Sequence, residues 1–196
     1  MKRTLLTILV AGSLVSAQAA IFEYTVSLTP APGVTTSGSG SGTATYDDVA
    51  RTLALDVSWS GLTLGTTVSH IHLPTVNPFD IGAGAGVVLT PTTLPGFPSG
   101  LTSGNYNTVL DMSSSATYPA AFIMANGNTT EGAETAVISA FDEGRAYWNI
   151  HTSFAPSGEI NGFMVLVPEP STFALFGLAG AALAFGAWRK RRAQVS

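Results

Sequence analysis

Apolar and polar side chains alternate from Phe22 to Leu28, and this is the first strong pattern in the chain. Successive side chains of a β-strand point to opposite faces, so a period of two predicts a strand with one buried face. The run "SGSGSG" at residues 37–42 follows. Its glycines and serines predict a flexible loop.

The next pattern predicts a β-hairpin. One strand ends at Tyr46, a turn forms around Asp47 and Asp48, and a second strand returns. The returning strand places a set of apolar side chains on one face, namely Leu53, Leu55, Val57 and Trp59. The start of the chain therefore indicates antiparallel β structure.

The remaining pattern adds short strands separated by turns. They are expected at 68–73, 87–89, 105–112, 145–153 and 159–167, with the last two forming a pair. One helix is expected at 133–141, ended by Gly144. About seven or eight short strands favour a mainly β fold, an antiparallel Greek-key β-sandwich or a flattened barrel.

The N-terminal residues have the pattern of a secretory signal peptide. Lys2 and Arg3 precede an apolar run at 5–15 and the small-residue pattern Ala17-Gln18-Ala19. Signal peptidase is expected to cut after Ala19. Residues 1–19 are therefore assigned to the signal peptide and residues 20–166 to one β domain.

Residues 167–196 have a different composition. Pro168-Glu169-Pro170 precedes the uncharged stretch 173–188, which is followed by Arg189, Lys190, Arg191 and Arg192. As a helix this stretch would span about 24 Å, enough to cross a locally thinned bilayer. The basic cluster is expected to stay in the cytoplasm, which places the domain across the inner membrane.

This C-terminal segment closely resembles the PEP-CTERM sorting signal of Gram-negative bacteria, in the order and spacing of its three parts. The resemblance implies recognition by an exosortase, in organisms that make exopolysaccharide. It also implies that the domain passes through the periplasm to the cell surface or the extracellular matrix. A permanent membrane anchor is the alternative, and the sequence does not separate the two.

The charge of the exported part differs from that of the whole chain. The chain has a formal net charge of −4. Residues 20–167 contain eleven carboxylates but only two basic residues, Arg51 and Arg145, which gives a formal charge of −9. Such a domain repels phosphate backbones, which excludes nucleic acid as an expected partner. The chain has no cysteine, so disulfides cannot stabilise it.

All three histidines of the chain lie in predicted strands. His70 and His72 belong to "SHIHLP", and His151 belongs to "YWNIHTS". By the period of two, His70 and His72 share one face, and Ile71 takes the opposite face. His151 likewise shares a face with Tyr147 and Asn149. The imidazoles are therefore expected to point away from the core.

Two interpretations of these histidines stay open. They form ordinary surface hydrogen bonds, or they form a solvent-open metal site made of His70, His72 and His151. Imidazole is a ligand that zinc and copper prefer, and catalytic zinc sites commonly use three protein ligands. Spacing alone does not decide between the two.

Several stretches together resemble the CHRD (chordin) domain over about residues 21–165. They are "WSGLTLGTTVSHIHLP", "GAGVV", "EGRAYWNIHT" and "SGEINGFM". The chain departs from the family pattern in two places. Asn161 stands where the family usually has arginine, and "LTPAPGV" replaces the usual Glu-Val-Pro.

A weaker resemblance is to copper/zinc superoxide dismutase, a Greek-key β-barrel. It places His70, His72 and His151 where three copper ligands would lie. The chain has no histidine for the metal-bridging position or for the zinc site. The resemblance therefore implies, at most, one mononuclear copper or zinc ion.

Other chemistry is sparse, since the chain has no cysteine nucleophile and no Gly-x-Ser-x-Gly motif. The leading hypothesis is a non-enzymatic, exosortase-sorted protein of the cell envelope or matrix, linked to exopolysaccharide. The alternative is a copper- or zinc-binding protein with weak dismutase-like chemistry.

Overall fold

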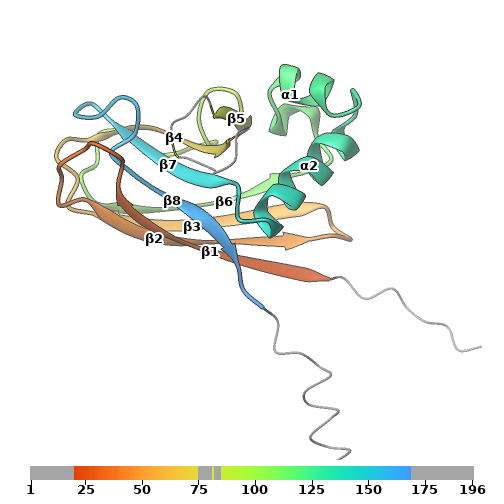
Figure 1. Ribbon diagram of the computed structural model, residues 1–196, viewed down its shortest axis with the longest axis horizontal. Helices are drawn as coiled ribbons and strands as arrows, with labels where there is room; N and C mark the ends of the chain where they lie inside the picture. Colours follow the sequence, from red (N-terminus) through yellow and green to blue (C-terminus); the bar gives the residue numbers. More distant parts are fainter. Residues whose placement is uncertain (1–19, 75–80, 82–84, 169–196) are drawn as a thin grey trace, which may run out of the picture.

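The computed structural model describes residues 20–74, 81 and 85–168 (Figure 1). Its β-strands are β1 Ile21–Pro30, β2 Ser39–Asp47, β3 Thr52–Ser60, β4 Thr66–Leu73, β5 Gly86–Leu89, β6 Gly104–Asp111, β7 Tyr147–Thr152 and β8 Ile160–Leu166. Its helices are the 3-10 helix η1 Ser115–Thr117 and the α-helices α1 Ala120–Ala125 and α2 Thr130–Asp142. Each strand expected from the sequence is present.

The eight strands form one antiparallel sheet in the order β5-β4-β7-β8-β1-β2-β3-β6. The sheet curls into a half-barrel, so that its β4–β7 side faces its β2–β3 side (Figure 1). The expected mainly antiparallel β fold is thus confirmed. In place of two separate sheets or a closed barrel, however, one continuous sheet curls over a single core, because β8 pairs with both β7 and β1.

The core lies inside the curl. Alternate residues of β1 are buried, as the period of two predicts. They meet the fully buried Trp148 and Ile150 of β7, which come from the facing side of the sheet. The sequence pattern thus selects the buried face of each strand, and burial of these apolar side chains from water drives the curl.

Helix α2 packs against one end of the half-barrel (Figure 1). It begins earlier than expected because the Thr129 hydroxyl accepts a hydrogen bond from the Gly132 N–H and caps the helix. Gly144 follows its end at a φ of 65°, a conformation that glycine adopts without strain. Phe141 packs edge-on against Tyr24 of β1, with ring centroids 5.1 Å apart.

The expected loop at 37–42 is wrong, because Ser39–Asp47 is strand β2. Gly40 and Gly42 lie between β1 and β3, where the chains approach closely. A Cβ at Gly40 would lie only 2.6 Å from the Ser58 carbonyl oxygen. Glycine is therefore used here for close packing, and pairing on both sides overrides its low strand propensity.

Within residues 20–74, 81 and 85–168, neither α-helix is long and apolar enough to cross a membrane. The expected signal peptide and the expected span at 173–188 lie outside the described residues.

Candidate metal centre

The three histidines come from two neighbouring strands. His70 and His72 lie on β4 and His151 on β7, and these strands pair with His70 opposite Asn149. Ile71, Trp148 and Ile150, which alternate with the histidines, are fully buried in the core. The prediction that the imidazoles point away from the core is confirmed, and the pairing of β4 with β7 brings all three to one place.

The imidazoles are in mutual contact. The Nδ1 atom of His70 lies 3.1 Å from the Nε2 atom of His151. The ring centroids of His70 lie 5.0 Å from those of His151 and 5.6 Å from those of His72. One ring nitrogen from each of the three histidines lies within 4.8 Å of the others.

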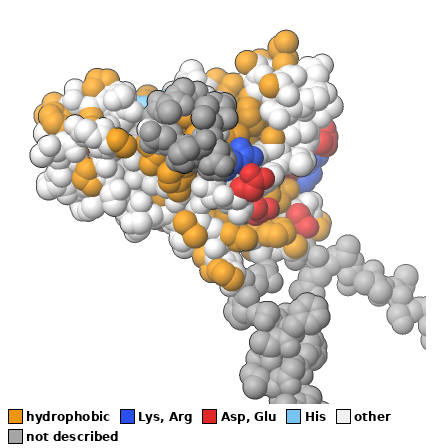
Figure 2. Space-filling model, viewed as in Figure 1, with side chains coloured by type: hydrophobic (Ala, Val, Ile, Leu, Met, Phe, Trp, Pro, Cys, Tyr) orange, Lys and Arg blue, Asp and Glu red, His pale blue; other side chains and the backbone are white. Residues whose placement is uncertain are grey.

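The expectation of a solvent-open site is wrong. His72 and His151 are each only 9% exposed, and His70 is half-buried. On the face shown in Figure 2, histidine contributes only a small patch of surface. The reason is that loops cover this face of the sheet, and their carbonyl oxygens contact the rings, namely those of Ala85, Thr92 and Pro156.

These carbonyl contacts determine which nitrogen of each neutral ring carries the proton. A carbonyl oxygen only accepts, so His72 Nδ1 donates to Ala85 over 3.1 Å and His151 Nδ1 donates to Pro156 over 2.8 Å. His70 Nε2 likewise donates to a carbonyl, that of Thr92, over 2.8 Å. The lone pairs of the three neutral rings are therefore His70 Nδ1, His72 Nε2 and His151 Nε2.

The lone pairs exceed the donors available to them. Among the described residues, His72 Nε2 is buried without a hydrogen-bond partner. When both rings are neutral, His70 Nδ1 and His151 Nε2 face each other as two acceptors, and of the described side chains only the Asn149 amide donates to the latter, over 3.2 Å. A cation between these atoms would satisfy all of them.

Burial keeps the rings of His72 and His151 in their neutral form. Desolvation lowers the pKa of His72 to about 4, although the Ala85 carbonyl acts in the opposite direction, and His70 and His151 lower it further. Burial also lowers the pKa of His151. Two of the three lone pairs are therefore free of protons at neutral pH.

Two of these residues, His70 and His151, have the spacing of zinc or copper ligands, whereas the ligand atoms of all three spread over as much as 4.8 Å, so His72 would have to move inward to join them. Two nitrogens bound tetrahedrally at about 2.0–2.1 Å lie about 3.3 Å apart, close to the 3.1 Å between His70 and His151. Histidine ligands characteristically donate their other ring N–H to a carbonyl or a carboxylate, and each histidine here does so. The three predicted ligand residues thus lie in one pocket, each with one ring nitrogen bonded to a backbone carbonyl.

Two neighbours of the histidines were not assigned a role from the sequence. The ring of Tyr147 stacks on that of His72, with centroids 5.0 Å apart and planes 9° apart. Asn149 is 3% exposed, and its Oδ1 atom has no hydrogen-bond partner. The period of two on β7 already placed both residues on the face of His151. The sequence pattern could therefore have identified them as neighbours of the site.

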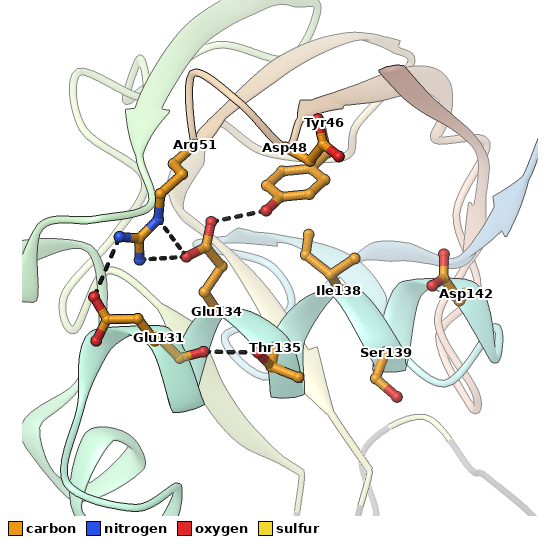
Figure 3. Close-up of a pocket in the computed structure, with 9 residues that line it drawn as sticks. All are labelled: Tyr46, Asp48, Arg51, Glu131, Glu134, Thr135, Ile138, Ser139 and Asp142. Atoms are coloured by element: carbon orange, nitrogen blue, oxygen red, sulfur yellow. Dashed lines mark hydrogen bonds and ion pairs between the residues drawn. The ribbon is translucent and has the colours of Figure 1, made fainter. Parts of the chain in front are cut away.

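A second polar cluster lies where α2 meets the β2–β3 hairpin (Figure 3). Glu134, 6% exposed, accepts hydrogen bonds from Tyr46 over 2.8 Å and from Arg51 Nε over 2.8 Å. Arg51 also reaches Glu131 over 3.2 Å. The charged side chains on the face in Figure 2 gather in this region. The residues of the cluster, namely Tyr46, Arg51, Glu131 and Glu134, border a cavity of about 580 Å³.

Of the predicted sorting motif, the structure describes only Pro168. Glu169, Pro170 and the basic residues 189–192 lie outside the described residues. Before them, the Val167 N–H donates to the Glu23 carbonyl over 2.8 Å, which ties the end of the domain to β1.

Comparison with known proteins identifies the two parts of the chain. No curated protein and no solved structure matches it, and the likeness to copper/zinc superoxide dismutase is not shown. Residues 166–192 match the PEP-CTERM protein-sorting motif, which implies exosortase processing and an exported, cell-surface protein. Residues 23–164 match the CHRD domain. This match covers most of the chain, which therefore belongs to the CHRD domain family.

Proposed function

We propose that this exported CHRD domain binds one zinc or copper ion through His70, His72 and His151. The observation that carries the proposal is the convergence of three imidazole lone pairs, each on a ring whose other nitrogen donates to a backbone carbonyl. The unpartnered His72 Nε2 supports it, because a buried acceptor without a donor costs free energy that an ion would recover.

The ion would join β4 to β7. A cross-link of this kind stabilises the folded state alone, because the unfolded chain does not hold the three rings together. An exported chain without cysteine cannot use a disulfide for this purpose. We infer that the ion has this binding role and no catalytic one, since loops cover His72 and His151, whereas catalytic zinc sites keep an open position for substrate.

Elemental analysis of the purified exported protein tests the proposal. We expect about one zinc or copper ion per chain in the wild type, and none in a His72→Ala variant with an unchanged circular dichroism spectrum. If that variant does not fold, His70→Gln provides the same test from the more exposed ring. A wild-type protein that stays metal-free in equimolar zinc and in equimolar copper would overturn the proposal.

We also propose the finer course of export. Signal peptidase cuts after Ala19, the segment 173–188 holds the chain in the inner membrane of a Gram-negative cell, and exosortase passes the domain to the surface. Deletion of residues 167–196 should release the domain in soluble form. Unchanged fractionation with the envelope would contradict this course. A variant with serine at each of residues 189–192 tests the contribution of the basic cluster apart from the rest of the signal.

A role in an exopolysaccharide matrix is a second candidate function, favoured by the outer face of the sheet. Exposed hydroxyls form a row across β1, β2 and β3, where Ser27 pairs with Ser41 and Ser41 with Ser58. Neighbouring strands lie about 4.8 Å apart, so this row offers closely spaced donors and acceptors without charge. Such a surface suits a neutral hydroxyl-rich polymer.

Co-sedimentation with exopolysaccharide from the producing cells tests this role. Ser41→Arg should weaken binding, because a long charged side chain would interrupt the row, whereas His72→Ala should bind as the wild type does. Equal binding of the wild type and Ser41→Arg would exclude this face as the contact surface.

A further inference from the structure

The Asn149 side chain lies in the histidine pocket and is 3% exposed. Its Nδ2 atom donates to the Ser157 carbonyl over 3.0 Å and to His151 Nε2 over 3.2 Å. Its Oδ1 atom has no partner. A carboxamide that is buried with its oxygen unpaired is unusual, because an unsatisfied buried acceptor costs about 1–3 kcal/mol.

The loop before β8 is shaped around this carboxamide. Gly158 has a φ of 123°, and a Cβ at this position would overlap Oδ1 of Asn149. A side chain at residue 158 is therefore excluded by the position of Asn149. The protein keeps room for a polar oxygen that forms no hydrogen bond with any described residue.

An ion at the three histidines would change the contacts of Asn149. It would take the lone pair of His151 Nε2, which now accepts the Asn149 N–H. That N–H would then face a nitrogen with no lone pair to offer. A half-turn of the carboxamide exchanges its oxygen and nitrogen and removes this conflict.

The exchange also puts an oxygen at ligand spacing. Oδ1 would take the present position of Nδ2, 3.2 Å from His151 Nε2, close to the roughly 3.3 Å between two ligands of a tetrahedral ion. Side-chain amide oxygens are metal ligands, and zinc accepts oxygen beside imidazole. The hydrogen bond to Ser157 would be lost, and Oδ1 would then face the Ser157 carbonyl oxygen as a second acceptor, so that carbonyl would have to turn away.

We propose that Asn149 is the fourth ligand of the metal centre, with its side-chain oxygen completing the three imidazoles. This inference rests on the proposed metal binding and deepens it. It assigns the site a closed N₃O donor set, which is the form of a structural site. Asn149 would thus have two partners in turn, His151 Nε2 in the metal-free protein and the ion in the loaded protein.

Zinc and cobalt titrations of the full chain in detergent test the proposal. We compare the wild type with Asn149→Ala and with Asn161→Ala, a matched control that is also 3% exposed and lies opposite Asn149 in the β7–β8 pair. Asn149→Ala should weaken zinc binding about tenfold to hundredfold and alter the visible spectrum of bound cobalt. Asn161→Ala should leave both unchanged.

Two further measurements keep the test decisive if Asn149→Ala does not fold. Asn149→Asp should bind zinc at least as tightly as the wild type, because a carboxylate oxygen replaces the amide oxygen. In the wild type, zinc should shift the side-chain NH₂ resonances of Asn149 more than those of Asn161. Equal zinc affinity and equal cobalt spectra for the wild type and Asn149→Ala would overturn this inference and leave the three-histidine site intact. A wild type that binds neither zinc nor cobalt would overturn this inference, and a wild type that also fails to bind copper would overturn the proposed metal binding as well.

Discussion

The histidine pocket and the Arg51–Glu134 cluster are both polar, and both are largely buried, yet their hydrogen-bond balance differs. In the cluster, both oxygens of Glu134 have donors, from Tyr46 and from Arg51. In the histidine pocket, His72 Nε2 and Asn149 Oδ1 have no donor within the described part of the chain. One region is complete within the chain, and the other holds more acceptors than donors.

This difference separates a structural role from a ligand site. A charged group that is paired and hydrogen-bonded holds α2 against the hairpin and needs nothing further. A pocket in which the described residues supply more lone pairs than donors is the one for which we propose a bound cation. The number of charged residues alone would favour the Arg51–Glu134 cluster as a ligand site, whereas the balance of donors and acceptors favours the histidine pocket that we propose.

Removal of Glu134 should have the largest effect on stability. Glu134→Ala leaves the buried Tyr46 hydroxyl without its acceptor and Arg51 without its main partner, so we expect a loss of about 3 kcal/mol in the free energy of unfolding. Urea denaturation measures it. Glu131→Ala is the matched control, because the side chain of Glu131 is 68% exposed, and its effect should be far smaller. Equal losses for the two would contradict the assigned role of Glu134.

Metal should stabilise the protein through the other region alone. At a free zinc concentration one hundred times the Kd, the free energy of unfolding should rise by about 2.7 kcal/mol. The increment should persist in Glu134→Ala, because the two regions share no residue, and it should vanish in His72→Ala. Denaturation with zinc and with chelator measures it. An increment that survives in His72→Ala would place the ion elsewhere.

Acid should destabilise the metal-free protein through the histidine pocket. The unfolded chain protonates His72 near its ordinary pKa of 6.5, whereas the folded protein keeps it neutral down to about pH 4. The unfolded state thus binds more protons in this window, so the contribution is present above pH 6.5 and is lost as the pH falls to 4.

The size of this loss should be at most about 3 kcal/mol, the free energy that corresponds to the full pKa difference. Denaturation with chelator at several pH values measures it, and His72→Phe should show a flatter profile. Parallel profiles for the two proteins would contradict the lowered pKa of His72.

The smallest effect is expected for His72→Phe at neutral pH without metal. The substitution keeps a ring to stack on Tyr147 and removes an unpaired acceptor, but it also removes the donor to Ala85. We expect these changes to offset each other within about 1 kcal/mol in urea denaturation. A loss as large as that of Glu134→Ala would make the histidines a structural cluster like the other region.

Local patterns predicted much of the fold. The period of two located the strands and the buried face of each, and Gly144 marked the end of α2. The same patterns missed the start of β2 at residues 39–42. Its glycines are needed because the backbone of β3 lies close to them, and this contact with another strand cannot be predicted from residues 39–42 alone. The curl of one sheet was missed for a related reason, since it follows from β8 pairing with both β7 and β1.

The sequence by itself determined that His70, His72 and His151 leave the core, because alternation along a strand is a property of the backbone. Only the tertiary structure decided that they meet, since the pairing of β4 with β7 joins residues about eighty positions apart. It also decided their burial and their tautomers, because the carbonyls of Ala85, Thr92 and Pro156 come from loops whose paths no local pattern specifies.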